Sequence, residues 1–483
     1  MDRSRPAPYP SVGHSRFRPT PPLDALPPDR QDARPDRPAA GAPEPHPGAA
    51  VGPARGERVA RVAFLVSLVV LSVLYGSYGA TQGWFPVKLV RKAEGDIRNL
   101  AANWRNDFAL EPTRHVVPAN DPEREPYRVL LPDELTPGLV LTAGLTPGRE
   151  TLQGATLYAA DGTEVHRWAI DYDELVPDGV GEFNVLAHGV APYPDGSIVV
   201  AFDAGEALAR IDACGDPMWI AEGGYHHVVS PNGDGTLWSW DREELVLLDA
   251  DSGEELDRID FRAEVLEAND LYGALAIRSS EDIANRSFGY FADMFHFNDV
   301  EALTDSMADA FPMFEAGDLL VSLRELNLVG VLRPETRELL WYRHGPWFKQ
   351  HDPDFLSDGT IGVYDNRMGL DASRIVAVDP ATDRIEDLLV DTPDTPFYSW
   401  RRGKWQPLPG GNLLVTESER GRVFEATADG RLVRDWNMIH DEATNYLVTS
   451  AELVGTDFFD PGALDCPPAD APMALVPDAS PTL

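Results

Sequence analysis

The chain has 483 residues, which is enough for two or three average domains or for one large repeat fold. Its formal net charge is −38, with 79 acidic residues against 41 basic ones. Proteins that bind nucleic acid neutralise phosphates with clustered lysine and arginine, so this balance argues against a nucleic-acid partner. The sequence has no Cys-x-x-Cys pair, which argues against a cysteine-rich zinc site. Its two cysteines, Cys214 and Cys466, allow one disulfide if the domain lies outside the cytosol.

Three segments precede the main body of the chain. Residues 1–58 are rich in proline, arginine, aspartate and alanine, so we expect a disordered tail. Residues 59–87 include an uncharged run, Val62–Val87, that is long enough to cross a membrane as a helix. The tail is longer than the usual start of a signal peptide, which favours an uncleaved anchor over a cleaved signal. For residues 88–135 we predict a juxtamembrane helix and a proline-rich linker.

From residue 136 onward, short β-branched and aromatic runs alternate with turns that are mostly Asp-Gly or glycine-rich. The pattern repeats about every 40 residues with four predicted strands per unit, which is typical of a β-propeller. Six units are visible, at residues 137–172, 183–222, 225–262, 295–343, 349–392 and 397–438. We therefore predict an all-β, six-bladed β-propeller over 136–455, with a closing strand in Asn445–Leu453 and a C-terminal tail over 456–483.

Histidines recur at one position of this repeat. His188, His227 and His351 each stand eight residues before the glycine of an Asp-Gly turn, and His296 opens another strand-like run. Equivalent positions in a radial repeat face a common axis, so we expect these side chains to converge. A lone histidine in a strand is more often structural than catalytic, and it is the shared register that favours a site here.

Four stretches of this body resemble the bacterial arylsulfotransferase family. They are HHVVSPNGDGTLWSW (226–240), FHFNDVEAL with LLVSLREL (295–303 and 319–326), QHDPDFLSDGTIGVYDN (350–366), and WQPLPGGNLLVTES followed by GRVFEATADG (405–430). The resemblance covers roughly residues 137–438. It implies a six-bladed propeller that moves a sulfuryl group from an aryl sulfate to a phenol at its axis. It also implies a propeller on the periplasmic or extracytoplasmic side of the membrane, a side that the basic residues on both flanks of the apolar run leave open.

The resemblance also implies roles for particular residues. The histidine of the family's Gln-His-Asp motif, which accepts the sulfuryl group transiently, matches His351. The other motif matches are His227 (with His226 as the neighbouring alternative), His296, Asn298 and Arg324. The candidate catalytic residues are His351, His227, His296 and Arg324. The candidate substrate contacts are Asn298, from its motif, together with His188 and Trp405, which the repeat register and the aromatic ring suggest and to which the resemblance gives no role.

Sulfuryl transfer makes definite demands on charge. The transition state spreads negative charge over the equatorial oxygens, which positive hydrogen-bond donors stabilise. Arg324 supplies a planar cation, and protonated His227 and His296 would add donors. His351 must instead be neutral, because it attacks sulfur with a nitrogen lone pair. Such a transfer needs no nucleotide cofactor, and the sequence has no Walker loop. We expect neither a cofactor nor a metal.

The sequence leaves other functions open. A non-catalytic propeller could bind a protein, a glycan or an anionic ligand at its axis, because a fold does not determine a function. A metal-dependent hydrolase would need at least three imidazole nitrogens around one zinc ion, and Arg324 beside them argues against a cation. Four tryptophans are candidates either for an aromatic substrate pocket or for packing between blades: Trp238, Trp240, Trp400 and Trp405.

Overall fold

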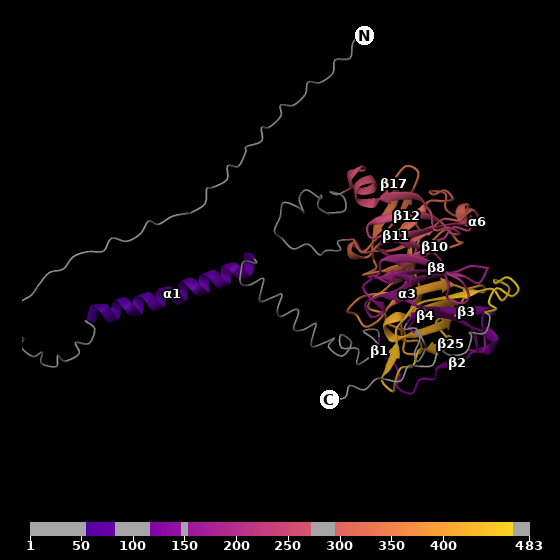
Figure 1. The fold of residues 1–483 in the computed structure, drawn as a ribbon, viewed down its shortest axis with the longest axis horizontal. Coiled ribbons are helices and arrows are strands. Elements are labelled where there is room, and N and C mark those ends of the chain that lie inside the picture. Colours follow the sequence, from indigo (N-terminus) through magenta and orange to yellow (C-terminus); the bar gives the residue numbers. More distant parts are fainter. Residues whose placement is uncertain (1–54, 83–115, 146–152, 272–294, 467–483) are drawn as a thin grey trace, which may run out of the picture. The chain divides into compact units, whose positions relative to one another are not determined.

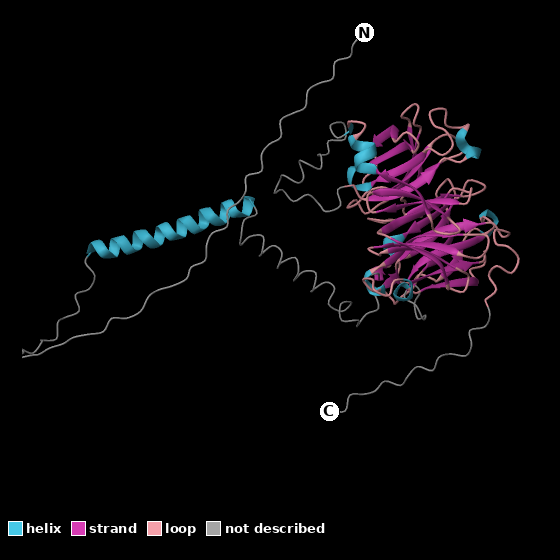
Figure 2. Cartoon of the chain, turned by 45° about the horizontal axis from the view of Figure 1, so that its top comes forward, coloured by secondary structure: helices cyan, strands magenta, loops and turns pink. Residues whose placement is uncertain are grey.

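The computed structural model describes residues 55–82, 116–145, 153–271 and 295–466. The chain divides into two units, one with a single long helix and one with all the described strands. Figure 2 shows that the second unit is almost entirely strand and loop. The predictions for residues 1–54 and 88–115 fall outside the described part of the chain.

Helix α1 (Arg55–Gln82) contains residues 59–82 of the predicted membrane segment, and residues 83–87 of that segment fall outside the described part of the chain. Its stretch Arg58–Gly76 has a mean hydropathy of 2.2 and is entirely unburied. Large apolar side chains such as Phe64 and Leu71 are exposed along it. An apolar helix of this length matches the hydrocarbon thickness of a bilayer. By length and composition, α1 can therefore cross a membrane.

The second unit is a six-bladed β-propeller, which confirms the predicted fold (Figure 1). Each blade is an antiparallel sheet, and the innermost strands of neighbouring blades contact one another around the ring. Blade 1 consists of β27 (Val448–Val454), β3 (Leu139–Leu145), β4 (Gln153–Tyr158) and β5 (Glu164–Ile170). Blade 2 consists of β6 (Leu186–Pro192), β7 (Ile198–Asp203), β8 (Ala207–Ile211) and β9 (Pro217–Glu222). Blade 3 consists of β10 (Tyr225–Pro231), β11 (Thr236–Asp241), β12 (Glu244–Asp249) and β13 (Glu255–Asp260).

The other three blades follow in chain order. Blade 4 consists of β14 (Phe297–Ala302), β15 (Leu319–Leu323), β16 (Leu328–Arg333) and β17 (Glu338–His344). Blade 5 consists of β18 (His351–Phe355), β19 (Ile361–Asp365), β20 (Arg374–Val378) and β21 (Ile385–Val390). Blade 6 consists of β22 (Lys404–Pro407), β23 (Leu413–Glu417), β24 (Arg422–Ala426), β25 (Leu432–Asn437) and β2 (Tyr127–Val129). The short helical segments are η1 (Pro132–Glu134), α3 (Tyr172–Leu175), η2 (Glu182–Asn184), η3 (Phe261–Glu267), α6 (Asp305–Ala308), η4 (Arg324–Leu326) and η5 (Ser418–Arg420).

Distant parts of the chain close the ring. Strand β27 pairs with β3 and becomes the innermost strand of blade 1, so the first predicted repeat supplies only three strands of its blade. At the other junction, β2 adds a fifth strand to the outer edge of blade 6, so this part of the predicted linker belongs to the propeller. A further pair joins β1 (Val116–Pro118) to β26 (Thr444–Tyr446). These pairings cover sheet edges that would otherwise be exposed, which stabilises a closed ring.

Aromatic side chains fill the spaces between blades. Trp240 of blade 3 is fully buried, and its ring stacks on Phe297 of blade 4 with centroids 4.1 Å apart. Trp238 is 4% exposed in the same hydrophobic cluster. Trp405 is also 4% exposed and lies in the cluster shared by blades 5 and 6. These three tryptophans are packing residues, since large aromatic rings bury the most apolar area.

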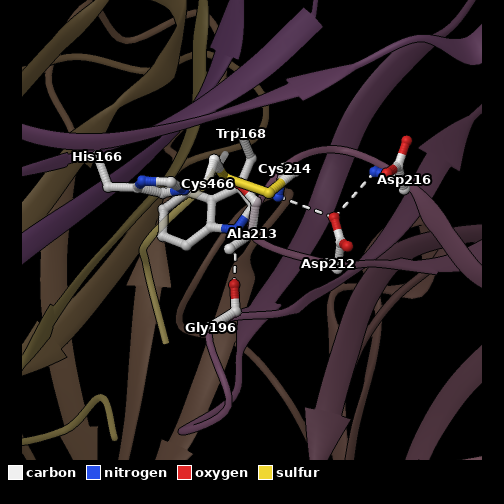
Figure 3. Close-up of a disulfide and its surroundings, with 8 residues drawn as sticks. All are labelled: His166, Trp168, Gly196, Asp212, Ala213, Cys214, Asp216 and Cys466. Atoms are coloured by element: carbon white, nitrogen blue, oxygen red, sulfur yellow. Dashed lines mark hydrogen bonds between the residues drawn. A yellow bond between two sulfur atoms is a disulfide. The ribbon is translucent and has the colours of Figure 1, made fainter. Parts of the chain in front are cut away.

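A disulfide between Cys214 and Cys466 joins the turn after β8 to the end of the described chain (Figure 3). Their Cα atoms lie 5.5 Å apart, although 252 residues separate them in sequence. Before Cys466, Phe458 and Phe459 pack against the hydrophobic cluster of blades 1 and 2. The first part of the predicted C-terminal tail thus lies against the propeller.

Candidate functional site

A cavity of about 920 Å³ opens where the innermost strands begin. It is lined by four of the predicted residues, namely His227, His296, Arg324 and His351. His351 is the first residue of β18, His296 immediately precedes β14, and His227 lies near the start of β10. Arg324 follows β15 at the same end of blade 4, where its backbone N–H donates to the His296 carbonyl at 3.1 Å. The structure therefore brings the four candidate catalytic residues together.

A β-bulge recurs in the innermost strands and sets the direction of these side chains. The register of the innermost strand shifts close to the site residue in each of blades 2 to 5, next to His188, His227, Asn298 and His351. His227 and His296 also have positive φ angles, of 63° and 50°. Bulges re-aim side chains and are frequent beside active sites, and non-glycine residues at positive φ are uncommon. The blades thus hold the histidines in a backbone geometry that a regular strand would not allow.

His351 is held by contacts to both ring nitrogens. Its Nδ1 lies 2.7 Å from Oδ1 of Asn366, and its Nε2 accepts the backbone N–H of Arg402 at 3.1 Å. The ring is 4% exposed. Burial lowers the pKa of His351 well below its ordinary value, and the nearby Arg324 guanidinium lowers that pKa further. The direction of this shift favours the neutral imidazole, which is the state that the sequence analysis expected of His351.

Asp203 is a central residue of the cavity that the sequence analysis missed. From the end of β7, its Oδ1 lies 3.0 Å from Nδ1 of His188 and 3.4 Å from Nδ1 of His227, and its Oδ2 lies 3.6 Å from Arg402 Nη2. Burial by itself would raise the pKa of Asp203, but these three neighbours lower the pKa well below the usual value. The side chain is a carboxylate that joins blades 2, 3 and 6.

His227 differs from its predicted state. Burial lowers the pKa of His227 well below its ordinary value, and the opposing effect of Asp203 is smaller. The expectation of a protonated His227 that donates to sulfuryl oxygens is therefore not supported, because desolvation disfavours the charged ring. Burial likewise lowers the pKa of His188, whose ring packs on His227 with centroids 4.7 Å apart.

The neighbouring His226 determines which nitrogen of His227 carries the hydrogen. Nε2 of His226 lies 2.9 Å from the Arg242 carbonyl, so Nε2 is a donor and Nδ1 is an acceptor in neutral His226. That acceptor lies 2.7 Å from Nδ1 of His227, which must then be protonated. Nε2 of neutral His227 therefore has the lone pair.

Guanidinium groups surround the imidazoles. The Arg324 side chain is 11% exposed, and its Nη1 pairs with Glu325 at 2.9 Å. Arg402 pairs with Glu419 at 2.7 Å, and Arg401 stacks on Trp400 with its guanidinium carbon 4.4 Å from the ring centroid. These arginines and Trp400 line the cavity. An anionic group with an aromatic portion would find both charge and stacking partners here.

Three predicted substrate contacts do not line the cavity. His188 lies behind His227, where it contacts Asp203. The Asn298 amide donates to the Gln350 carbonyl at 2.8 Å, which ties blade 4 to blade 5. The indole of Trp405 donates to the Asp352 carbonyl at 2.9 Å within the interblade core. Trp400 and Phe297 are the residues with aromatic carbon rings among those that line the cavity.

One side-chain group among the described residues has donor atoms close enough to share a metal ion. It consists of His188, Asp203 and His227, whose ligand atoms lie within 4.8 Å of one another. The group has two imidazoles and one carboxylate, a kind of ligand set that catalytic zinc sites also use, and not the three imidazoles that the hydrolase alternative was expected to need. The Arg402 guanidinium beside Asp203 already supplies positive charge there.

A second charged cluster lies on the same innermost strands, centred on Lys404 of β22. Its ammonium lies 2.6 Å from Asp352 Oδ1 and 3.8 Å from Asp299 Oδ1. Burial raises the pKa of Asp299 to about 7 and that of Glu301 to about 8. It also raises the pKa of Glu452 to about 7. Lys404 is thus the positive partner of several carboxyl groups from neighbouring blades.

Comparison with solved structures finds proteins whose similarity to this chain is low. A protein of unknown function from Bacteroides caccae is 14% identical (TM-score 0.43, covering 65% of this chain and 98% of that chain). A putative 6-phosphogluconolactonase from Bacteroides fragilis is 11% identical (TM-score 0.38, covering 66% and 98%). Virginiamycin B lyase from Staphylococcus aureus is 12% identical (TM-score 0.30, covering 51% and 69%). At these scores they carry no argument about chemistry, and no curated protein matches the chain.

The fold and the cavity define a class: a six-bladed propeller whose site combines imidazoles with guanidinium groups. The model of the arylsulfotransferase (ASST) family matches residues 190–438, which is more than half of the chain. The chain belongs to the arylsulfotransferase family, as its motifs predicted.

Proposed function

We propose that this protein transfers a sulfuryl group from an aryl sulfate to a phenol, with His351 as the transient acceptor. The observation that carries the proposal is a neutral, buried imidazole beside Arg324 in a cavity large enough for an aromatic ligand. Ligand cavities for drug-sized molecules are about 300–1,000 Å³. The 920 Å³ cavity falls within this range.

In the first half of the proposed reaction, Nε2 of His351 gives up the hydrogen bond that it accepts from the Arg402 backbone N–H and attacks the sulfur of the aryl sulfate. An N–S bond forms while the S–O bond to the aryl group breaks, and the donor leaves as a phenolate that takes a proton from solvent. Arg324 faces the negative charge on the sulfuryl oxygens, and His296 lies beside it as a further contact. Throughout the reaction, Nδ1 of His351 keeps its hydrogen, which is directed at Oδ1 of Asn366.

In the second half, the oxygen of an acceptor phenol attacks the same sulfur and releases His351. The acceptor must lose its proton, and Nε2 of His227 has the lone pair to take it. The resulting imidazolium is stabilised by Asp203, which lies 3.4 Å from Nδ1. Proton loss to solvent then restores neutral His227, so the charge and the atoms balance over the cycle. Trp400 and Phe297 are the aromatic contacts proposed for both substrates.

The covalent step can be tested with the donor alone. We expect detergent-solubilised protein, quenched after incubation with an aryl sulfate, to yield a peptide containing His351 with the added mass of one SO3 group. A burst that releases one donor phenol per protein molecule should accompany this adduct. An adduct on His227 or His296 would overturn the role assigned to His351. Transfer without any adduct would show that the sulfuryl group passes directly between substrates.

We also propose that the protein is a single-pass membrane protein whose propeller lies outside the cytoplasm. Helix α1 supports the anchor, and the Cys214–Cys466 disulfide supports an oxidising compartment, because such bonds are rare in the cytosol. Protease added to intact spheroplasts should degrade the propeller while a cytoplasmic marker protein stays intact. Equal protection of both proteins would place the propeller on the cytoplasmic side.

A further inference from the structure

Asn366 lies directly after β19 and is fully buried beside the proposed nucleophile. Its Nδ2 donates to the carbonyl of Ser399 at 2.7 Å and also to the carbonyl of Arg402. Carbonyl oxygens only accept hydrogen bonds, so these contacts identify which end of the amide is the NH₂ group. Oδ1 of Asn366 is therefore the atom that lies 2.7 Å from Nδ1 of His351.

This amide orientation determines the tautomer of His351. An amide oxygen can only accept, so Nδ1 of the imidazole must carry the hydrogen. Nε2 then has the lone pair, and the backbone N–H of Arg402, which donates to it at 3.1 Å, marks the direction of that lone pair. The contacts of Asn366 and Arg402 both indicate an imidazole ring with its hydrogen on Nδ1 and its lone pair on Nε2.

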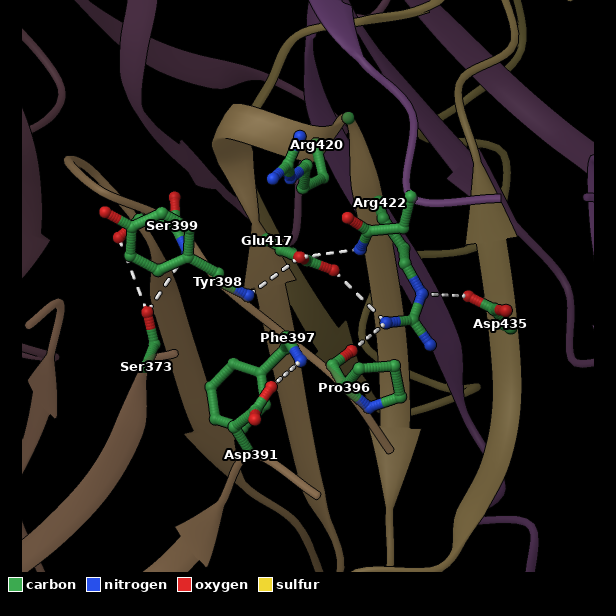
Figure 4. Close-up of polar contacts among 12 residues, drawn as sticks. Ser373, Asp391, Pro396, Phe397, Tyr398, Ser399, Glu417, Arg420, Arg422 and Asp435 are labelled. Carbon is green, nitrogen blue, oxygen red and sulfur yellow. Dashed lines mark hydrogen bonds and ion pairs between the residues drawn. The ribbon is translucent and has the colours of Figure 1, made fainter. Parts of the chain in front are cut away.

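The segment that holds Asn366 is itself held in place. Figure 4 shows the pair formed by Ser373 and Ser399, in which the Ser399 N–H donates to the Ser373 hydroxyl at 3.1 Å. The same hydroxyl donates to the Asn366 carbonyl at 3.2 Å, and the Ser399 hydroxyl donates to the Arg401 carbonyl at 2.8 Å. The carbonyls that orient Asn366 thus belong to a segment with little freedom to shift.

The histidines in and beside the cavity have two different kinds of polar neighbour. His188 and His227 face a carboxylate, Asp203, whereas His351 faces an uncharged amide. The other titratable or charged groups around His351 come from several elements: Arg324 of η4, His296 before β14, His188 of β6, Arg402 before β22, Asp352 beside it on β18 and Tyr364 opposite it on β19. A carboxylate in place of the amide would stabilise the protonated imidazole, which cannot attack sulfur.

We propose that Asn366 is the positioning residue of the nucleophile: its carbonyl holds the hydrogen on Nδ1, and its lack of charge leaves Nε2 unprotonated. The inference rests on the proposed function, since it assigns a role toward His351 as nucleophile. A merely structural asparagine would contribute to folding without influencing the protonation of His351.

The near-isosteric change Asn366→Asp separates these roles. A carboxylate within about 4–6 Å of an ionisable base shifts its pKa by about 1–3 units. We therefore expect the acidic limb of the kcat/KM profile for the aryl sulfate to move up by about 1–3 pH units. Activity should recover on the alkaline side of the new limb. An unmoved limb in a folded variant, together with an unchanged kcat in Asn366→Ala, would overturn the proposal.

The matched control is Asn232→Asp, which adds the same charge in the turn between β10 and β11, where the Asn232 amide donates to Thr236. It should leave the profile in place. If Asn366→Asp does not fold, Asn366→Ala carries the test. Loss of Oδ1 frees the ring, and misplacement by about 1 Å can cost about 10²-fold in rate. An unchanged kcat in Asn366→Ala would contradict the proposal.

A second readout does not depend on catalysis. Diethyl pyrocarbonate modifies only neutral imidazole, so the rate of modification of the His351 peptide against pH reports the protonation of that ring. We expect the midpoint to rise in Asn366→Asp and to stay in place in Asn232→Asp. If the wild-type protein shows neither transfer nor an adduct, the proposed function fails, while this midpoint still decides the role of Asn366. A midpoint that is the same in all three proteins would refute that role.

Discussion

Replacing His351 with alanine is expected to abolish sulfuryl transfer while the propeller stays folded. The change removes the Nε2 lone pair that is proposed to bond to sulfur. In a serine protease, loss of the nucleophile costs about 10⁶ in kcat. Transfer from a chromogenic aryl sulfate to a phenol should therefore fall below detection.

Folding of the same variant is expected to be nearly unaffected. The His351 ring contacts Asn366 and Arg402 at the cavity wall, where water can replace it, and it belongs to none of the hydrophobic clusters between blades. Circular dichroism and thermal unfolding check this point. His440→Ala is the control, since His440 contacts Thr444 and lies outside the cavity lining. Full transfer by His351→Ala would end the covalent mechanism.

Replacing Lys404 with methionine is expected to lower the free energy of unfolding by about 3–5 kcal/mol at pH 8, the usual cost of leaving a buried charge without its partner. Methionine keeps the length of the side chain but not the ammonium that contacts Asp352 and Asp299. The facing carboxylates would then repel one another. The loss should be visible in denaturant unfolding of the solubilised protein.

The deficit of Lys404→Met should also depend on pH. Ordinary values are 3.8 for aspartate and 4.5 for glutamate, whereas the pKa of Asp299 is about 7 and that of Glu301 about 8. The folded state therefore binds more protons than the unfolded state between about pH 4 and 8, and these groups lose stability as pH rises through that window. Without the Lys404 ammonium, their pKa values rise further, so the deficit should be larger at pH 8 than at pH 5.

An exposed cation provides the control for this second prediction. Arg384 pairs with Glu386 at 3.5 Å, with both side chains largely exposed. Arg384→Met should change the unfolding free energy by less than about 1 kcal/mol, because surface ion pairs contribute little. A deficit of Lys404→Met that is equally small, or equal at the two pH values, would show that the axial carboxyl groups do not depend on Lys404.

The repeat was predictable because each blade is local in sequence. Alternating strands and Asp-Gly turns depend on neighbouring residues, and the units predicted at 225–262 and 349–392 contain blades 3 and 5 almost residue for residue. Closure was only partly predictable. The strand near Asn445–Leu453 was expected, but its pairing with β3 and the addition of β2 to blade 6 join residues about 300 positions apart. No local pattern encodes such a partner.

The sequence by itself determined that several histidines would meet, because equal positions in a radial repeat face one axis, and the family motifs singled out Arg324 and His351. The tertiary structure alone decided what surrounds them. Asp203 and Asn366 each lie 15 residues after a site histidine, at the end of the second strand of a blade, but this shared register does not show which ring nitrogens they contact. Arg402 comes from the segment before β22 and reaches His351 only through the fold. The tertiary structure also decided that Trp405 packs between blades and that His227 is neutral, because burial depends on neighbours brought from other blades.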